Sequence, residues 1–154
     1  MRKQKGFSLI ELLIVVAIIL IIAAIAIPNL LKSRIAANEA SAVGATRTMV
    51  TAEMTYMSTN PSVGYITLTL LNGAGLVDTV LATGKKSGYS WNETIDSGTN
   101  SPINDQFYFG AQPLSPGSSG TRYFCTTEDG VLKFNSTTAL AARATCISET
   151  GVLQ

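Results

Sequence analysis

Residues 1–28, which decide the fold, read MRKQKGFSLIELLIVVAIILIIAAIAIP. The stretch has a short basic leader that ends at Gly6, an apolar run that reaches Ile27, and a single carboxylate, Glu11, near the start of that run. Counted from Phe7, the run is 21 residues long. An α-helix of that length crosses the roughly 30 Å hydrocarbon core of a bilayer. We therefore expect a helix that can reside in a membrane.

Two simpler interpretations of this segment compete with one that uses Glu11. A secretory signal peptide also has a basic start and an apolar run, and Ala24-Ile25-Ala26 resembles its cleavage site, but the run is long for such a peptide. A plain membrane anchor explains the length but not the carboxylate. An acidic side chain inside a spanning segment costs at least about 2.5 kcal/mol. A function for Glu11 therefore accounts for the segment best.

The run Gly6-Phe7-Ser8-Leu9-Ile10-Glu11, continued by apolar residues to Ile19, resembles the prepilin signature of type IV pilins and type II secretion pseudopilins. The resemblance is close over about the first 30 residues and only architectural beyond them. It implies that residues 1–6 are a leader, which a membrane-embedded prepilin peptidase removes after Gly6 on the cytoplasmic side. The same enzyme would then N-methylate Phe7, the new terminus.

Within this family, Glu11 has a natural partner. An isolated carboxylate is costly in an apolar medium unless a cation accompanies it. The resemblance supplies the cationic N-terminus of Phe7 on a neighbouring subunit, and this pairing would set the axial register of a polymer. Pro28 falls where the family usually has a proline and where the helix unwinds locally in filaments. Many members have a glycine about eight residues before it, where this chain has Leu20.

The composition argues against other functional classes. The chain has 11 basic and 10 acidic residues, and loss of the leader's three basic residues leaves a charge of about −2. This is no basic footprint for nucleic acid. Histidine is absent, which removes the commonest general base and metal ligand. We expect no metal, no cofactor and no enzymatic activity, although a membrane-tethered enzyme stays as an alternative.

Beyond Pro28, an amphipathic helix half is expected over residues 29–60, ending where Asn60 precedes Pro61. Helical spacing predicts a stripe of side chains that face the core. Glu39 and Glu53 are expected to lie largely elsewhere on the helix. The predicted stripe consists of Ala36, Ala40, Val43, Val50, Met54 and Met57.

The remaining residues are expected to complete a globular head, which spans residues 29–154. A connecting region at 61–88 should hold one or two short helical pieces, with Lys85-Lys86 as a solvated turn. Residues 89–154 should form the sheet and a disulfide loop. The fold class is α+β, with a long helix on an antiparallel sheet of about four strands. Alternation and the Asp129-Gly130 turn signal place these strands at 89–95, 106–111, 122–127 and 131–134.

The two cysteines, Cys125 and Cys146, enclose a loop that an exported domain can close with a disulfide worth about 3 kcal/mol. Two buried free thiols are the alternative. The resemblance adds that pilins commonly have a C-terminal disulfide loop, whereas the major type II pseudopilins usually have a calcium-stabilised loop. This favours a pilus subunit.

The sequence therefore predicts a structural subunit of a type IV pilus-like surface filament. The alternative is a minor pilin or pseudopilin that acts in cargo export or DNA uptake. The expected partners are other copies of the chain, the prepilin peptidase/methyltransferase and the inner-membrane assembly platform, with no nucleic acid assigned. The subunit would cross the inner membrane once, N-terminus in the cytoplasm, before it joins the surface filament. Adhesion, motility, secretion and DNA uptake stay open as roles.

Overall fold

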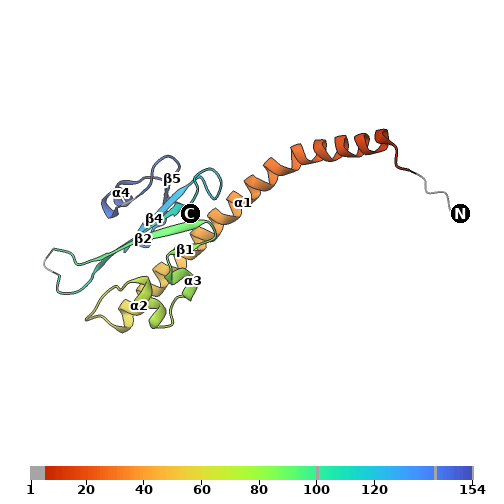
Figure 1. The fold of residues 1–154 in the computed structure, drawn as a ribbon. Coiled ribbons are helices and arrows are strands. Elements are labelled where there is room, and N and C mark those ends of the chain that lie inside the picture. The colour runs from red at the N-terminus through yellow and green to blue at the C-terminus, as the bar shows by residue number, and fades with distance from the viewer. Residues whose placement is uncertain (1–5, 100, 141, 154) are drawn as a thin grey trace. The chain divides into compact units, whose positions relative to one another are not determined.

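The computed structural model describes residues 6–99, 101–140 and 142–153, so the first five leader residues lie outside the described part. The chain divides into two compact units, residues 1–34 and residues 35–154. Helix α1 (Leu9–Thr59) begins in the first unit and ends in the second (Figure 1). The predicted long N-terminal helix is confirmed, and Pro28 lies inside it without ending it.

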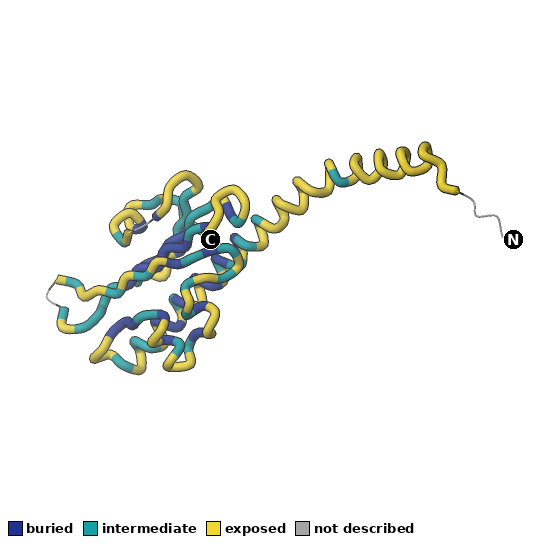
Figure 2. The backbone as a smooth tube through the Cα atoms, viewed as in Figure 1, coloured by how far each residue is buried: buried dark blue, intermediate teal, exposed yellow. Residues whose placement is uncertain are grey.

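Between Leu12 and Ile27, α1 is apolar around its whole circumference. Its best 18-residue window has a mean hydropathy of 3.3, and none of that window is buried. Within the described residues, α1 is the one helix whose length and composition would allow it to cross a membrane. Figure 2 shows this part of the helix as almost continuously exposed.

The second unit is a head in which the C-terminal part of α1 packs against a five-stranded antiparallel meander. The strands are hydrogen-bonded in chain order, each to the next along the chain. Three short helices complete the head. The elements after α1 are α2 (Leu68–Gly73), α3 (Thr79–Ala82), β1 (Lys85–Lys86), β2 (Tyr89–Asp96), β3 (Gln106–Pro113), β4 (Tyr123–Thr127), β5 (Lys133–Asn135) and α4 (Arg143–Ser148).

The four predicted strands are confirmed, and the sheet has a fifth. Lys85 and Lys86, expected as a solvated turn, form the edge strand β1 and pair with Ser90 and Tyr89. The reason is the next two residues: Ser87 and Gly88 have φ of 49° and 75°. Two consecutive residues with positive φ make the tight turn whose twist suits a hairpin. Helix α4 was not predicted.

The helix stripe predicted to face the core is wrong by about one residue. The buried apolar side chains of α1 are Ala42, Ala45, Met49 and Ala52. Small alanines bring the helix close to the sheet, where large aromatic side chains such as Phe109 fill the core. None of the six predicted residues is fully buried: Ala36, Ala40 and Met54 are exposed, and Val43, Val50 and Met57 are half-buried.

Polar side chains also lie on this buried face, because each finds a partner in the head. The Glu39 carboxylate accepts hydrogen bonds from the Thr121 amide at 2.8 Å and from the Arg122 guanidinium at 2.7 Å. Burial opposes ionisation of Glu39, but these bonds outweigh it and lower the pKa of the carboxyl. Thr46 accepts a hydrogen bond from the indole of Trp91 at 3.0 Å. The helix is therefore fixed to the sheet by directional contacts as well as by apolar packing.

A second buried carboxyl, Glu53, is less well satisfied. Its Oε2 accepts a hydrogen bond from the Ile66 amide at 3.1 Å, while its Oε1 is buried without a partner. Leu68 lies two residues after Ile66, and its amide donates a hydrogen bond to the Glu93 carboxylate at 2.9 Å. Burial, and secondly the negative charge of Glu93, raise the pKa of Glu53 to about 7. The carboxyl groups of Glu53 and Glu93 thus accept hydrogen bonds from the amides of Ile66 and Leu68, and the two carboxylates repel each other when both are ionised.

The C-terminal segment covers the other face of the sheet. Cys125 on β4 and Cys146 on α4 form a disulfide, with Cα atoms 5.9 Å apart. Tyr108 and Leu140 complete a small core around it, and the Tyr108 hydroxyl donates to the Leu140 carbonyl. Because both faces of β3 are covered, this strand is buried almost without alternation. The disulfide prediction is confirmed.

We expect Glu53→Gln to change how the stability of the head depends on pH. The folded state holds the Glu53 proton up to a pKa of about 7, against an ordinary value of 4.5. Glu53 therefore favours folding most at low pH, and that contribution is lost as the pH rises through about 7. Glu93, and Tyr65, whose own pKa Glu53 helps to raise, are the charged or titratable groups that interact with it.

Between about pH 5 and about pH 8, the wild type should lose about 2 kcal/mol more free energy of unfolding than the Glu53→Gln variant. Denaturant titration of the full chain in detergent at both pH values measures this difference. Equal losses in the two proteins would contradict the prediction.

Removal of the disulfide should destabilise the head. The bond closes a loop between residues separated by 21 positions. A bond across a loop of that length contributes about 3 kcal/mol to the free energy of unfolding. The paired substitution Cys125→Ser and Cys146→Ser should lose about that amount in denaturant titration, and unchanged stability would show that packing alone holds the C-terminal segment.

Candidate assembly site

The helix begins at a local hydrogen-bond arrangement that involves Glu11. Ser8 precedes the first residue of α1, and its carbonyl accepts the first helical bond from Leu12 at 3.3 Å. The Glu11 side chain reaches back, and its Oε2 accepts a hydrogen bond from the Ser8 amide at 2.9 Å. This is one half of a capping box, and a carboxylate also stabilises the positive end of the helix dipole. Glu11 therefore has a role within its own chain that the sequence analysis did not foresee.

The sequence-predicted processing residues lie together at this end of α1. Gly6 is exposed, and a Cβ at that position would meet no atom within 4 Å. Phe7 is 75% exposed. The peptide bond between them is therefore open to a protease, and Glu11 lies one helical turn away. Pro28 is not part of this group, because it follows Glu11 by about 25 Å along the helix.

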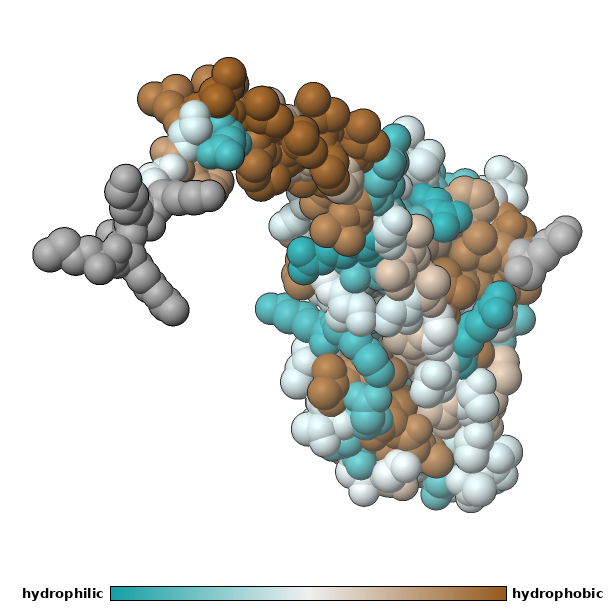
Figure 3. Space-filling model, turned by 90° about the vertical axis from the view of Figure 1, so that its right-hand side faces the viewer, coloured by the Kyte–Doolittle hydropathy of each residue, from teal (hydrophilic) through white to brown (hydrophobic). Residues whose placement is uncertain are grey.

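After this end of the helix, the exposed surface of α1 is almost continuously apolar. Nearly all large side chains from Leu9 to Leu31 are exposed, and the space-filling view shows them as a hydrophobic surface (Figure 3). A soluble monomer rarely exposes so large an apolar patch. The segment must be covered by lipid or by protein. Its one charged side chain, Glu11, accepts a hydrogen bond through only one of its two oxygens within the described residues, and the other oxygen can accept from a cation.

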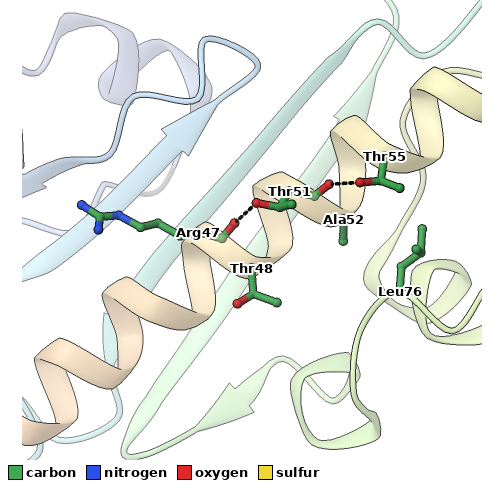
Figure 4. Close-up of a pocket in the computed structure, with 6 residues that line it drawn as sticks. All are labelled: Arg47, Thr48, Thr51, Ala52, Thr55 and Leu76. Atoms are coloured by element: carbon green, nitrogen blue, oxygen red, sulfur yellow. Dashed lines mark hydrogen bonds between the residues drawn. The ribbon is translucent and has the colours of Figure 1, made fainter.

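The head has a second exposed helix face, which the sequence analysis did not single out. It lies on α1 and includes Gly44, Arg47, Thr48, Thr51 and Thr55. Arg47 is exposed. A hollow of about 340 Å³ lies beside this face, between the threonines and Leu76 (Figure 4). A helical glycine followed by threonines at helical spacing was the signal in the sequence.

Comparison with known proteins gives matches at the N-terminal end. Residues 1–27 match the family model of the prokaryotic N-terminal methylation motif. The type IV wide pilus major component PilA4 of Thermus thermophilus is 67% identical over 39 residues, which are 25% of this chain and 30% of that protein. The type IV major pilin protein PilA of Myxococcus xanthus is 45% identical over 56 residues, 36% of this chain and 26% of that protein.

The matches therefore span less than a third of either relative, and no solved structure matches the chain. What the family model does cover is residues 1–27, which contain the predicted leader, the predicted cleavage point, Glu11 and the apolar run. The structure adds a long helix followed by an antiparallel sheet, as the resemblance implied. The motif and these relatives show that the N-terminal part of this chain is similar to that of type IV pilins.

Proposed function

We propose that the protein is the structural subunit of a type IV pilus-like surface filament. A prepilin peptidase cleaves the chain after Gly6 and N-methylates Phe7. The observation that carries this proposal is the exposed apolar helix, which begins beside an accessible Gly6–Phe7 bond and contains a single carboxylate. Such a surface is stable in a membrane or inside a polymer, but not in water.

In the proposed filament, the free amine of Phe7 on one subunit pairs with Glu11 on its neighbour. Cleavage creates that amine at the end of the helix where the second oxygen of Glu11 has no partner among the described residues. A subunit that is out of register leaves both charges unpaired in an apolar medium, which is costly. Because the contact joins two different parts of the subunit, it repeats without closing and builds an open helical filament.

Before assembly, the subunit crosses the inner membrane once. The basic leader stays in the cytoplasm and the head lies outside, in line with the positive-inside rule. An outward head also suits the disulfide between Cys125 and Cys146, since disulfides persist in oxidising compartments. The partners are the peptidase, the inner-membrane assembly platform and other copies of the chain.

A major filament subunit fits better than a minor pilin or a secretion pseudopilin. Both named relatives are major pilus components by their titles. The disulfide-closed C-terminal segment is also the feature that the resemblance associates with pilins. These observations support a structural rather than a catalytic role.

The proposed processing predicts the mass of the assembled protein. Protein sheared from the cell surface should consist of filaments whose chains begin at a methylated Phe7 and lack residues 1–6. Intact-mass and N-terminal peptide mass spectrometry measure this directly. A chain that begins after Ala26 would instead show an ordinary signal peptide.

Two substitutions at Glu11 should separate its two roles. Glu11→Gln keeps a side-chain oxygen that can accept from the Ser8 amide but removes the charge, whereas Glu11→Leu removes both. If pairing with Phe7 drives assembly, both variants lose surface filaments although both are cleaved and reach the membrane. Electron microscopy of sheared fractions and mass spectrometry of the membrane fraction provide the two readouts. Normal filaments from Glu11→Gln would show that the helix cap, and not the charge, is what assembly needs.

A further inference from the structure

The part of the head that contains α2 and α3 is held in place mainly by apolar packing. The two short helices pack side by side (Figure 1). Most of the hydrogen bonds of this part close within it, such as the one from the Asn72 side chain to the Val77 carbonyl at 2.9 Å. Its buried leucines, which include Leu71 and Leu81, join the main core. Apolar contacts of this kind are not directional, so the position of α2 and α3 depends strongly on the few polar contacts to the rest of the head.

The chain is fixed by hydrogen bonds on either side of these two helices. Before them, the Tyr65 amide donates to the Asn104 carbonyl at 2.7 Å, and the Asn104 side chain donates to the Tyr65 carbonyl at 3.2 Å. After them, the Gly84 carbonyl accepts a hydrogen bond from the Trp91 amide at 2.8 Å. We refer to residues 66–83, which lie between these fixed points, as the flap. A segment of this kind can open locally while the strands that hold its ends stay paired.

The first residues of the flap are held down by two carboxyl groups. Glu53 on α1 accepts a hydrogen bond from the Ile66 amide, and Glu93 on β2 accepts one from the Leu68 amide. Glu53 is completely buried, and its Oε1 has no hydrogen-bond partner among the described residues. A buried carboxylate with an unpaired oxygen is costly, and a like charge nearby adds to that cost. The closed flap therefore favours the protonated form of Glu53.

The other titratable groups around this contact do not compensate a charge on Glu53. Tyr65, the residue before the flap, is buried and neutral, and its pKa is raised by burial and by the negative charges of Glu128, Glu53 and Asp105. Arg143 is the cation in this group, and it pairs with Glu128. Within the part of the chain that the structure describes, Glu53 itself forms no ion pair. Ionisation of Glu53 thus adds an uncompensated charge beneath the flap.

We propose that the flap is a pH-sensitive device, which stays closed on the head while Glu53 is protonated and opens when Glu53 and Glu93 both carry a negative charge. Opening releases the amides of Ile66 and Leu68 and lets water reach the Glu53 carboxylate. The device belongs to the head of a single subunit, so it goes beyond the proposed filament function and does not depend on it.

The sign and size of the effect follow from the two states of Glu53. Its pKa is about 7 with the flap closed and 4.5 where water surrounds it. Protonation therefore favours the closed flap at low pH, and this contribution is lost as the pH rises through about 7. Between about pH 6 and about pH 8, the equilibrium constant for opening should rise about tenfold.

Hydrogen exchange of the full-length protein in detergent, measured by mass spectrometry of peptides from the flap, tests this expectation at the two pH values. The ratio of the wild-type rate to the Glu53→Gln rate cancels the pH dependence of the exchange chemistry, and we expect this ratio to rise about tenfold. Asp96→Asn removes an exposed carboxylate from the same strand as Glu93, and its flap should behave as in the wild type. An unchanged ratio, or an Asp96→Asn flap that behaves like that of Glu53→Gln, would overturn the proposal.

Peptides from β3 separate opening of the flap from unfolding of the whole head. This strand is paired on both sides, so its amides should exchange more slowly than those of the flap at either pH. Equal opening constants for the flap and β3 would overturn the proposal, because the head would then unfold as one unit. If Glu53→Gln fails to fold, Glu93→Gln replaces it. Loss of the neighbouring charge should make the rise in flap opening smaller than in the wild type, and a rise of the same size would contradict the proposed role of the two carboxyl groups.

Discussion

A single carboxylate in the otherwise uncharged apolar segment 7–28 is the constraint on which the rest of this protein depends. The segment around Glu11 exposes apolar side chains on every side, so it is stable only in lipid or against other protein. In either medium an unpaired carboxylate is costly. The hydrogen bond from the Ser8 amide satisfies one oxygen, and the other has no partner within the part of the chain that the structure describes. In the proposed filament a cation from another subunit completes the arrangement, and that cation is the amine of Phe7.

The head also buries polar and charged side chains, but their hydrogen-bond partners lie within the same chain. Its helix face is buried, yet it carries Glu39, Thr46 and Glu53 among the alanines. Glu39 receives enough hydrogen bonds to favour its charged form, and Thr46 accepts from Trp91. Glu53 is left with one oxygen unpaired beside a second carboxyl, and its pKa rises accordingly. The contacts that specify how the helix lies on the sheet are therefore unequal in quality, and Glu53 is the weakest of them.

The sequence alone was sufficient where one physical signal dominates. The long N-terminal helix, the strands with alternating aromatic residues and the disulfide were all predicted and are present. It failed where the signal depends on contacts distant in sequence. A count of apolar residues placed the buried helix face one residue away, because it could not know that Glu39 and Glu53 have partners at Thr121 and Ile66. Likewise, the two lysines of β1 give no apolar strand signal, and they form a strand because the turn at Ser87 pairs them with β2.

The exposed surfaces of the two halves of α1 differ in polarity, and each can be buried for a different reason. The first half has almost no polar side chains, so it cannot remain in water and must enter a membrane or a polymer at once. The second half is soluble on its outer face, yet its threonine hydroxyls are already bonded to the helix backbone and Gly44 leaves room for close approach. Such a face costs little to hydrate and little to bury. In the proposed function the subunit is first a membrane protein and then a filament component, and that combination along one helix suits both states.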